Sequence, residues 1–267
     1  MNISLNDPAD KAADQPYNRS TTSRHKKKYK NSARLFADAR YSLLGNLRTA
    51  VWSQLLYLIT LLFLSTLPGS IRFENTALDL AFILLGRFIT SLFASLFGIG
   101  LSLVFLNLQY GQQASVRNLF HCFFAFPDKA VRVRSFVTAG ELLCLLPIQL
   151  TVYFIPYSSF KKYLPLVLAA AIVSIAASVL WSASYAMTNF LLLDFPQLDA
   201  GRILRASSKI MNGSRLRLIR LFLRLLPLHL LGVFSFGLAN LYAGICQNAC
   251  AAAFYKDLMQ KNAPADS

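Results

Sequence analysis

The chain has 267 residues, of which 55% are hydrophobic and only 15% are charged. This composition excludes an ordinary water-soluble domain, about a quarter of which would be charged. Lysine and arginine outnumber aspartate and glutamate by 27 to 12, which gives a formal net charge of +15. Because the chain also contains long apolar segments, this excess indicates that the partner is anionic lipid at a cytoplasmic membrane surface rather than nucleic acid.

Residues 1–33 form a polar arm that cannot bury a core, and we expect it to be disordered in the cytoplasm. Its charges are not followed by the apolar stretch and small-residue cleavage site of a signal peptide. The arm contains a basic run that includes Lys26, Lys27 and Lys28. We predict that these lysines contact anionic headgroups; a solvated topology signal and nucleic-acid binding are the alternatives.

Five apolar segments follow the arm, at residues 50–67, 77–108, 136–154, 164–193 and 218–254. Each of the first four is long enough for one transmembrane helix, which requires about 20 residues. Within the second segment, residues 88–108 are sufficient for a span. The fourth segment has 30 uncharged residues, more than a bilayer requires, so we expect a helix that is tilted or projects beyond the membrane.

The last segment, residues 218–254, is too long for one span and short for two. Its centre contains Gly232, Gly237, Ala239 and Asn240, which favour a turn. We predict two short helices that reverse direction within residues 234–240, and the alternative is one long helix. The expected fold is therefore an all-α polytopic membrane protein with six transmembrane helices, or five if the last segment forms a single helix.

Basic residues are concentrated in alternate connections between these segments. Ten precede residue 49, four lie between the second and third segments, and five lie between the fourth and fifth. The connections on the other side contain only Arg72, Lys161 and Lys162. Because Lys and Arg are retained on the cytoplasmic side, the N-terminus is predicted to be cytoplasmic, and six spans place the C-terminus there as well.

A weak internal repeat becomes visible when Gly45 is aligned with Gly213, which brings Leu43 opposite Met211. Each stretch is a short amphipathic run that ends in glycine and leads into an apolar segment, and residues 116–137 contain a looser version. We predict three units, each a short amphipathic interfacial helix followed by a membrane hairpin. The alternative is that any interfacial helix before a span has this pattern. Such a helix can lie in the headgroup layer with its apolar face buried.

Five residues are candidates for an intramembrane or lipid-binding role. Glu141 lies inside an apolar segment, where a carboxylate is costly and usually faces a partner or a water-filled cavity, although its side chain could also extend to the interface. Arg217, Arg220 and Arg224 share one helix face and either bind lipid phosphates or anchor a short helix. His229 is interpreted as a hydrogen-bonded packing residue, with a proton relay as the alternative.

The sequence contains no recognisable catalytic, cofactor-binding or metal-binding motif. The cysteines, Cys122, Cys144, Cys246 and Cys250, lie in or beside apolar segments and are interpreted as small buried hydrophobic residues. We therefore expect a non-enzymatic protein that organises the membrane or assists transport. A small transporter that uses Glu141 is the first alternative, and an intramembrane enzyme that acts on lipids is the second.

Several short motifs occur in an order and spacing that resemble one family. They are Gly45-Asn46, Leu108-Gln109-Tyr110-Gly111, Leu193-Asp194-Phe195-Pro196, Ser208-Lys209-Ile210-Met211-Asn212-Gly213 and Phe254-Tyr255-Lys256-Asp257-Leu258. Over residues 34–258 the chain resembles the bacterial integral membrane family called domain of unknown function 975. The resemblance implies a multi-pass protein of the bacterial inner membrane and no established reaction.

The chain departs from the family pattern in two places. A Pro-Gly pair ahead of Tyr185 and a Pro-Tyr pair in the last helix are both missing, so helix kinks at these positions are in doubt. We expect three parts: the arm at residues 1–33, a single membrane domain at residues 34–258, and a short cytoplasmic tail at residues 259–267.

Overall fold

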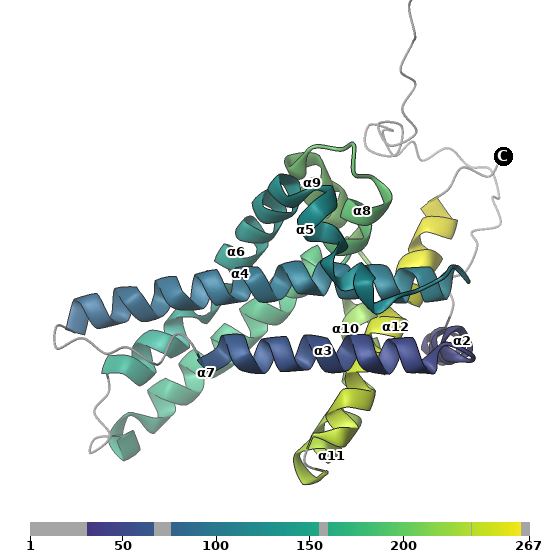
Figure 1. Ribbon diagram of the computed structural model, residues 1–267. Coiled ribbons are helices and arrows are strands. Elements are labelled where there is room, and N and C mark those ends of the chain that lie inside the picture. Colours follow the sequence, from purple (N-terminus) through teal and green to yellow (C-terminus); the bar gives the residue numbers. More distant parts are fainter. Residues whose placement is uncertain (1–30, 67–75, 155–159, 236, 263–267) are drawn as a thin grey trace, which may run out of the picture.

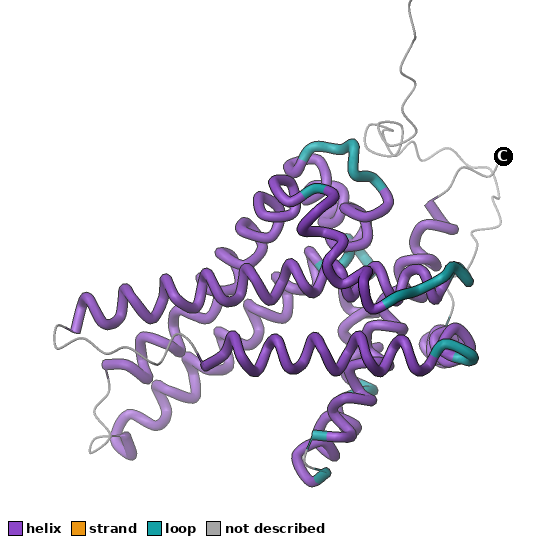
Figure 2. The backbone as a smooth tube through the Cα atoms, in the orientation of Figure 1, coloured by secondary structure: helices purple, strands orange, loops and turns teal. Residues whose placement is uncertain are grey.

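The computed structural model describes residues 31–66, 76–154, 160–235 and 237–262. These residues form helices joined by short connections, and no β-strand occurs among them (Figures 1 and 2). The predicted all-α fold is therefore confirmed. The basic arm up to residue 30 lies outside the described residues.

Three similar units follow one another along the chain, each a short helical segment followed by a helical hairpin (Figure 1). The first unit consists of α2 (Ser32–Leu43), α3 (Leu47–Thr66) and α4 (Thr76–Gln109). The second consists of η2 (Val116–Phe120), α5 (His121–Ala125), α6 (Pro127–Phe154), α7 (Phe160–Tyr185) and α8 (Thr188–Asp194). The third consists of α9 (Ala200–Met211), α10 (Arg215–Leu223), α11 (Leu226–Phe234) and α12 (Leu238–Asn262).

Four helical stretches of the described chain are long and apolar enough to cross a membrane: α3, α4 from Ala81 onward, α6, and Tyr163–Asp194. The protein is therefore a polytopic helical membrane protein. The fourth stretch, expected to be longer than a bilayer requires, is helical from Tyr163 to Asp194 apart from one short break. The helix is interrupted at Ala186 and Met187, after which α8 continues as a separate short helix whose side chains from Phe190 to Leu192 are buried.

The third hairpin confirms the predicted reversal and excludes the single long helix. Between α11 and α12 the backbone turns at Gly237, which has a φ of +89° and donates its N–H to the carbonyl of Gly232 at 3.0 Å. A positive φ costs a glycine little, because it has no Cβ. Gly232 lies against Asn240, since a Cβ at position 232 would lie 2.8 Å from the Asn240 Cβ. In Figure 1, α11 projects in a different direction from α3, α4, α6 and α7.

The repeat predicted from the glycine alignment is present in the backbone. Helices α2 and α9 are both 12 residues long. Asn31 precedes α2 with φ −67° and ψ 151°, and Asp199 precedes α9 with φ −69° and ψ 151°. After each helix a glycine adopts a left-handed conformation, Gly45 with φ +88° and Gly213 with φ +81°. The matching backbone conformations before these helices and the matching glycine turns after them show that the first and third units begin with the same backbone structure, although only Asp199 caps its helix with its side chain.

The second unit begins with the looser version, η2 and α5, and then joins the common pattern. Where its hairpin begins, the Ala130 N–H donates a hydrogen bond to the Phe126 carbonyl at 3.2 Å. The same bond forms in the other units, Ala50 to Asn46 at 3.3 Å and Leu218 to Ser214 at 3.1 Å. The three donors, Ala50, Ala130 and Leu218, are all buried. All three hairpins therefore leave the core in an equivalent way.

The units form a closed ring, because each short segment contacts the hairpin of the unit before it. Helix η2 packs on α4, α9 packs on α6 and α7, and α2 packs on α12. The last of these contacts joins the beginning of the described chain to its end. Chain segments that are distant in sequence therefore lie side by side, as Figure 1 shows for α2 and α12.

The core lies where the three hairpins meet, a region that we call the base. It contains α2, η2, α5, α8, α9 and the C-terminal turns of α4 and α12. Residues 88–108, expected to suffice for a span, lie within the candidate span Ala81–Gln109. Eight of the ten residues at positions 99–108 are buried, so this end of α4 is enclosed by protein. The three hairpins extend from the base and have exposed apolar tips; we call them the first, second and third arms, as distinct from the basic arm at the N-terminus. Phe234 at the tip of the third arm is 85% exposed.

The amphipathic helices α2 and α9 bury their apolar faces in protein. Leu35 of α2 and both Ile203 and Met211 of α9 are fully buried, and all three belong to the core of the base. From the sequence we predicted that these faces lie in the lipid headgroup layer. In the structure they instead attach each unit to its neighbour.

Replacing Gly100 with alanine tests the contact between η2 and α4. A Cβ at position 100 would lie 2.0 Å from the carbonyl oxygen of Leu119, so we expect Gly100→Ala to lower the free energy of unfolding by about 3 kcal/mol through overpacking. Gly98→Ala is the matched control, because its nearest contact would be the Tyr57 hydroxyl at 3.7 Å. Thermal unfolding in detergent should show a lower Tm for Gly100→Ala only; equal Tm values would contradict this packing.

Candidate functional site

A partly buried arginine, Arg134, marks the contact between the first and second units. Helix α6 begins at Pro127, which suits the first turn of a helix because proline lacks the N–H that would be unbonded there. The helix therefore starts nine residues before the apolar segment predicted at 136–154. Arg134 and Glu141 then lie seven residues apart on the same face of α6.

Hydrogen bonds connect Arg134 to two other helices. Its Nη1 donates to Oδ1 of Asn189 on α8 at 3.2 Å, and Nδ2 of Asn189 donates to the Ser102 hydroxyl on α4 at 3.3 Å. The Ser102 hydroxyl donates in turn to the Gly98 carbonyl at 2.9 Å. This chain of side chains passes from α6 through α8 to α4 and holds the second unit against the first.

The charge of Arg134 also acts on groups that it does not bond. Glu141 on α6, Tyr57 on α3 and Cys122 on α5 all interact electrostatically with it. The Nε of Arg134 is buried and has no hydrogen bond within the described chain. Removing a guanidinium charge from water costs free energy unless the charge is paired. Because a guanidinium has five N–H donors, Arg134 can bind a further acceptor.

Glu141, the carboxylate singled out from the sequence, lies between α6 and α7. The Ser182 hydroxyl of α7 donates to its Oε1 at 3.4 Å. One turn earlier, the indole N–H of Trp181 donates to the Val137 carbonyl at 3.0 Å, and Gly140 lies directly against the Trp181 ring. The two helices are therefore in close contact at the level of Glu141, and the carboxylate is partly exposed.

The structure places the predicted arginines in two different environments. Arg217 is bound to Asp257 of α12 at 2.5 Å, and its guanidinium lies 4.9 Å from the Phe254 ring centroid. Arg220 and Arg224 are exposed at the beginning of the third arm. Arg217 therefore ties α10 to α12, and lipid binding by the other two stays a prediction.

The remaining predicted residues do not gather around Glu141. His229 lies on α11, where its Nε2 is 3.1 Å from Oε1 of Gln247 on α12, within the third hairpin. The lysines Lys26, Lys27 and Lys28 lie outside the described residues. The candidate residues thus form no common site, and the chain of Arg134, Asn189 and Ser102 is the group that sequence reasoning missed.

Polar side chains cross between units at several further points of the base. Nδ2 of Asn248 in the third unit donates to Oε1 of Gln54 in the first at 3.1 Å. The Tyr255 hydroxyl in the third unit donates to Oδ2 of Asp194 in the second at 2.6 Å. Lys256 donates to the Gln109 carbonyl of the first unit at 3.0 Å. Together with the bond between Asn189 and Ser102, these contacts join all three units.

The four cysteines are free thiols, and Cys122, Cys246 and Cys250 are buried, whereas Cys144 is only partly so. Burial raises the pKa of the Cys122 thiol to about 11, and the opposing effect of the nearby Arg134 charge is smaller. Cys122 is therefore protonated at neutral pH and acts as an apolar side chain.

Two signals in the sequence could have identified the role of Arg134. Pro127 is favourable at the start of a helix, and a helix that starts there places Arg134 and Glu141 on one face. The arginine was instead assigned to a basic connection, because the apolar segment begins at Phe136. Asn189 and Ser102 have no local signal, since their meeting depends on how the units pack.

Comparison with known proteins agrees with the resemblance noted in the motifs. A family model described as protein of unknown function (DUF975) matches residues 31–262. The searches of curated proteins and of solved structures found no match.

Proposed function

The chain belongs to the family described as protein of unknown function (DUF975), and we propose that it is a non-enzymatic component of the bacterial cell membrane that organises the surrounding lipid or assists transport. The observation that carries this proposal is that polar side chains in the base form hydrogen bonds between the units. Asn248, Tyr255, Lys256 and Asn189 each bond to a residue of another unit. Polar networks of this kind rigidify a core and specify one arrangement, as a scaffold requires.

Anionic lipid is the partner that the exposed surface favours. Arg220 and Arg224 are exposed one helical turn apart, and the neighbouring Leu216 and Leu223 are 71% and 60% exposed. A surface that combines cations with large apolar side chains suits the boundary between headgroups and acyl chains. Each basic residue near an anionic membrane contributes about 1 kcal/mol. The proposal is that this surface, with the basic arm, gathers anionic lipid around the base.

Neutralising the two arginines tests the lipid proposal. We expect Arg220→Gln combined with Arg224→Gln to reduce the ratio of phosphatidylglycerol to phosphatidylethanolamine that co-purifies with the protein, because about 2 kcal/mol of attraction is lost. Lipid mass spectrometry measures this ratio. The matched control is Arg220→Lys with Arg224→Lys, which keeps the charge and should keep the ratio. An unchanged ratio in the glutamine variant would contradict the proposal.

The orientation that we propose has both termini in the cytoplasm and six crossings. The uneven distribution of Lys and Arg supports it. The contact between α2 and α12 supports it as well, because it brings the two ends of the membrane domain to the same side of the bundle. Four long apolar stretches are candidate spans, and in this proposal the third hairpin supplies the remaining two.

A reporter fused after Ser267 tests this orientation. Green fluorescent protein at that position should be fluorescent and alkaline phosphatase inactive, since the first folds in the cytoplasm and the second is active only in the periplasm. The same pair fused after Thr66 is the control and should give the opposite result. An active phosphatase after Ser267 would mean an odd number of crossings.

Transport through the protein is the second candidate function, and the arrangement of Arg134 and Glu141 favours it. Two opposite charges on one face of α6, with the polar residues Tyr57, Ser102 and Asn189 nearby, could pass a proton or ion between the first and second units. Ionisable groups within a membrane bundle commonly mark such a pathway. In this proposal Glu141 is the group that is protonated and deprotonated.

The variant Glu141→Gln tests the transport candidate. In proteoliposomes with an entrapped pH-sensitive dye, the unmodified protein should conduct protons above the level of empty vesicles, and Glu141→Gln should reduce this flux at least tenfold because the amide cannot ionise. Glu141→Asp keeps a carboxylate and should retain most of the flux. Equal fluxes for the unmodified protein and Glu141→Gln would remove this candidate.

A further inference from the structure

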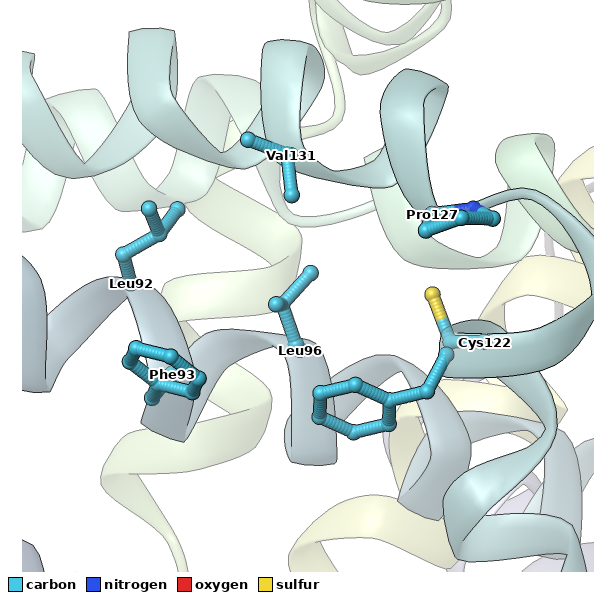
Figure 3. A pocket seen from close by; sticks show the side chains of 7 residues that line it. Leu92, Phe93, Leu96, Cys122, Pro127 and Val131 are labelled. Atoms are coloured by element: carbon cyan, nitrogen blue, oxygen red, sulfur yellow. The ribbon is translucent and has the colours of Figure 1, made fainter.

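An apolar cavity of about 220 Å³ lies where the first and second arms leave the base (Figure 3). Its walls are formed by residues of α4, α5 and α6. They are Leu92, Phe93 and Leu96 of α4, Cys122 and Phe123 of α5, and Pro127 and Val131 of α6. In Figure 3, Leu96 points toward Val131 and Pro127, and the Cys122 sulfur faces the same space.

The cavity arises from the path of the chain between α4 and α6. After α4 ends, η2 and α5 pack back against it, with the Phe97 ring 5.6 Å from the Phe120 ring and 5.1 Å from the Phe123 ring. The close approach of Gly100 to Leu119 fixes this return. Helix α6 therefore begins beside the middle of α4, and α5 closes the cavity toward the base.

The outer side of the cavity continues into the lipid-facing surface of the first arm. Leu85, Ile89 and Phe93 follow one another at four-residue spacing on α4, and all three are exposed. On the opposite wall Val131 is exposed as well. A stripe of exposed apolar side chains thus leads from the arm directly to the cavity.

We infer that this cavity binds one acyl chain of a membrane phospholipid, held between α4 and α6 with α5 at its inner end. The walls contain only apolar side chains and a thiol, so the occupant is a hydrocarbon, and the continuous stripe on α4 makes the bilayer its source. An occupant that fills the space restores the dispersion contacts that an empty cavity lacks. The inference depends on the membrane location of the chain and not on the organising role proposed above.

The experiment uses the full chain in nanodiscs that contain a phospholipid with a diazirine on its acyl chain. After irradiation, mass spectrometry of peptides locates the labelled residues. We expect labels to be concentrated at least fivefold at Leu92–Leu96, Phe123 and Val131 relative to Leu62 and Ile172, which lie on lipid-facing parts of α3 and α7. Because no charged side chain lines the cavity, phosphatidylglycerol and phosphatidylethanolamine probes should give the same pattern.

A tryptophan at the mouth of the cavity supplies the matched comparison. Val131→Trp should reduce labelling of Leu92–Leu96 and Phe123 severalfold, whereas Val152→Trp, at an exposed position of the same helix outside the cavity, should leave it unchanged. Even labelling of cavity and lipid-facing residues in the unmodified chain would overturn the inference, whether or not Val131→Trp folds.

Discussion

A polar side chain inside a membrane bundle must find its partner within the protein, and this constraint accounts for the way the three units are held together. Asn248 meets Gln54, Tyr255 meets Asp194, and Asn189 meets Ser102. In each pair the two residues belong to different units. The apolar faces of α2 and α9 act in the same sense, because each is buried against a neighbouring hairpin. The ring therefore exists through contacts that no single unit could satisfy alone.

Features that depend on local backbone chemistry could be predicted from the sequence. Gly45 and Gly213 indicated equivalent turns, and Gly237 indicated the reversal between α11 and α12, because glycine tolerates a positive φ. Features that depend on surroundings could not. The apolar run at residues 99–108 is enclosed by protein and the tip of α11 is exposed, yet both are largely apolar. Burial in lipid and burial in protein leave the same pattern in a sequence.

The candidate site shows the same division. Glu141 was recognisable as a carboxylate within an apolar segment, whereas Arg134 was hidden by its position before that segment. The repeat shows that Arg134 occupies a position that is common to all three units. Arg134 lies eight residues after Phe126, just as Gln54 lies eight after Asn46 and Phe222 lies eight after Ser214. At equivalent positions the three units thus contain a cation, an amide and an aromatic ring, so their junctions differ chemically within one common architecture.

The contact between α2 and α12 has a consequence for biogenesis. The ribosome releases α2 first and α12 last among the helices of the described chain. Until α12 is made, α2 lacks its main partner and is left with its smaller contact with α4. Any ribosome that stalls before α12 leaves α2 in this state. An incomplete chain therefore exposes the surface of α2 that the final helix covers in the finished protein.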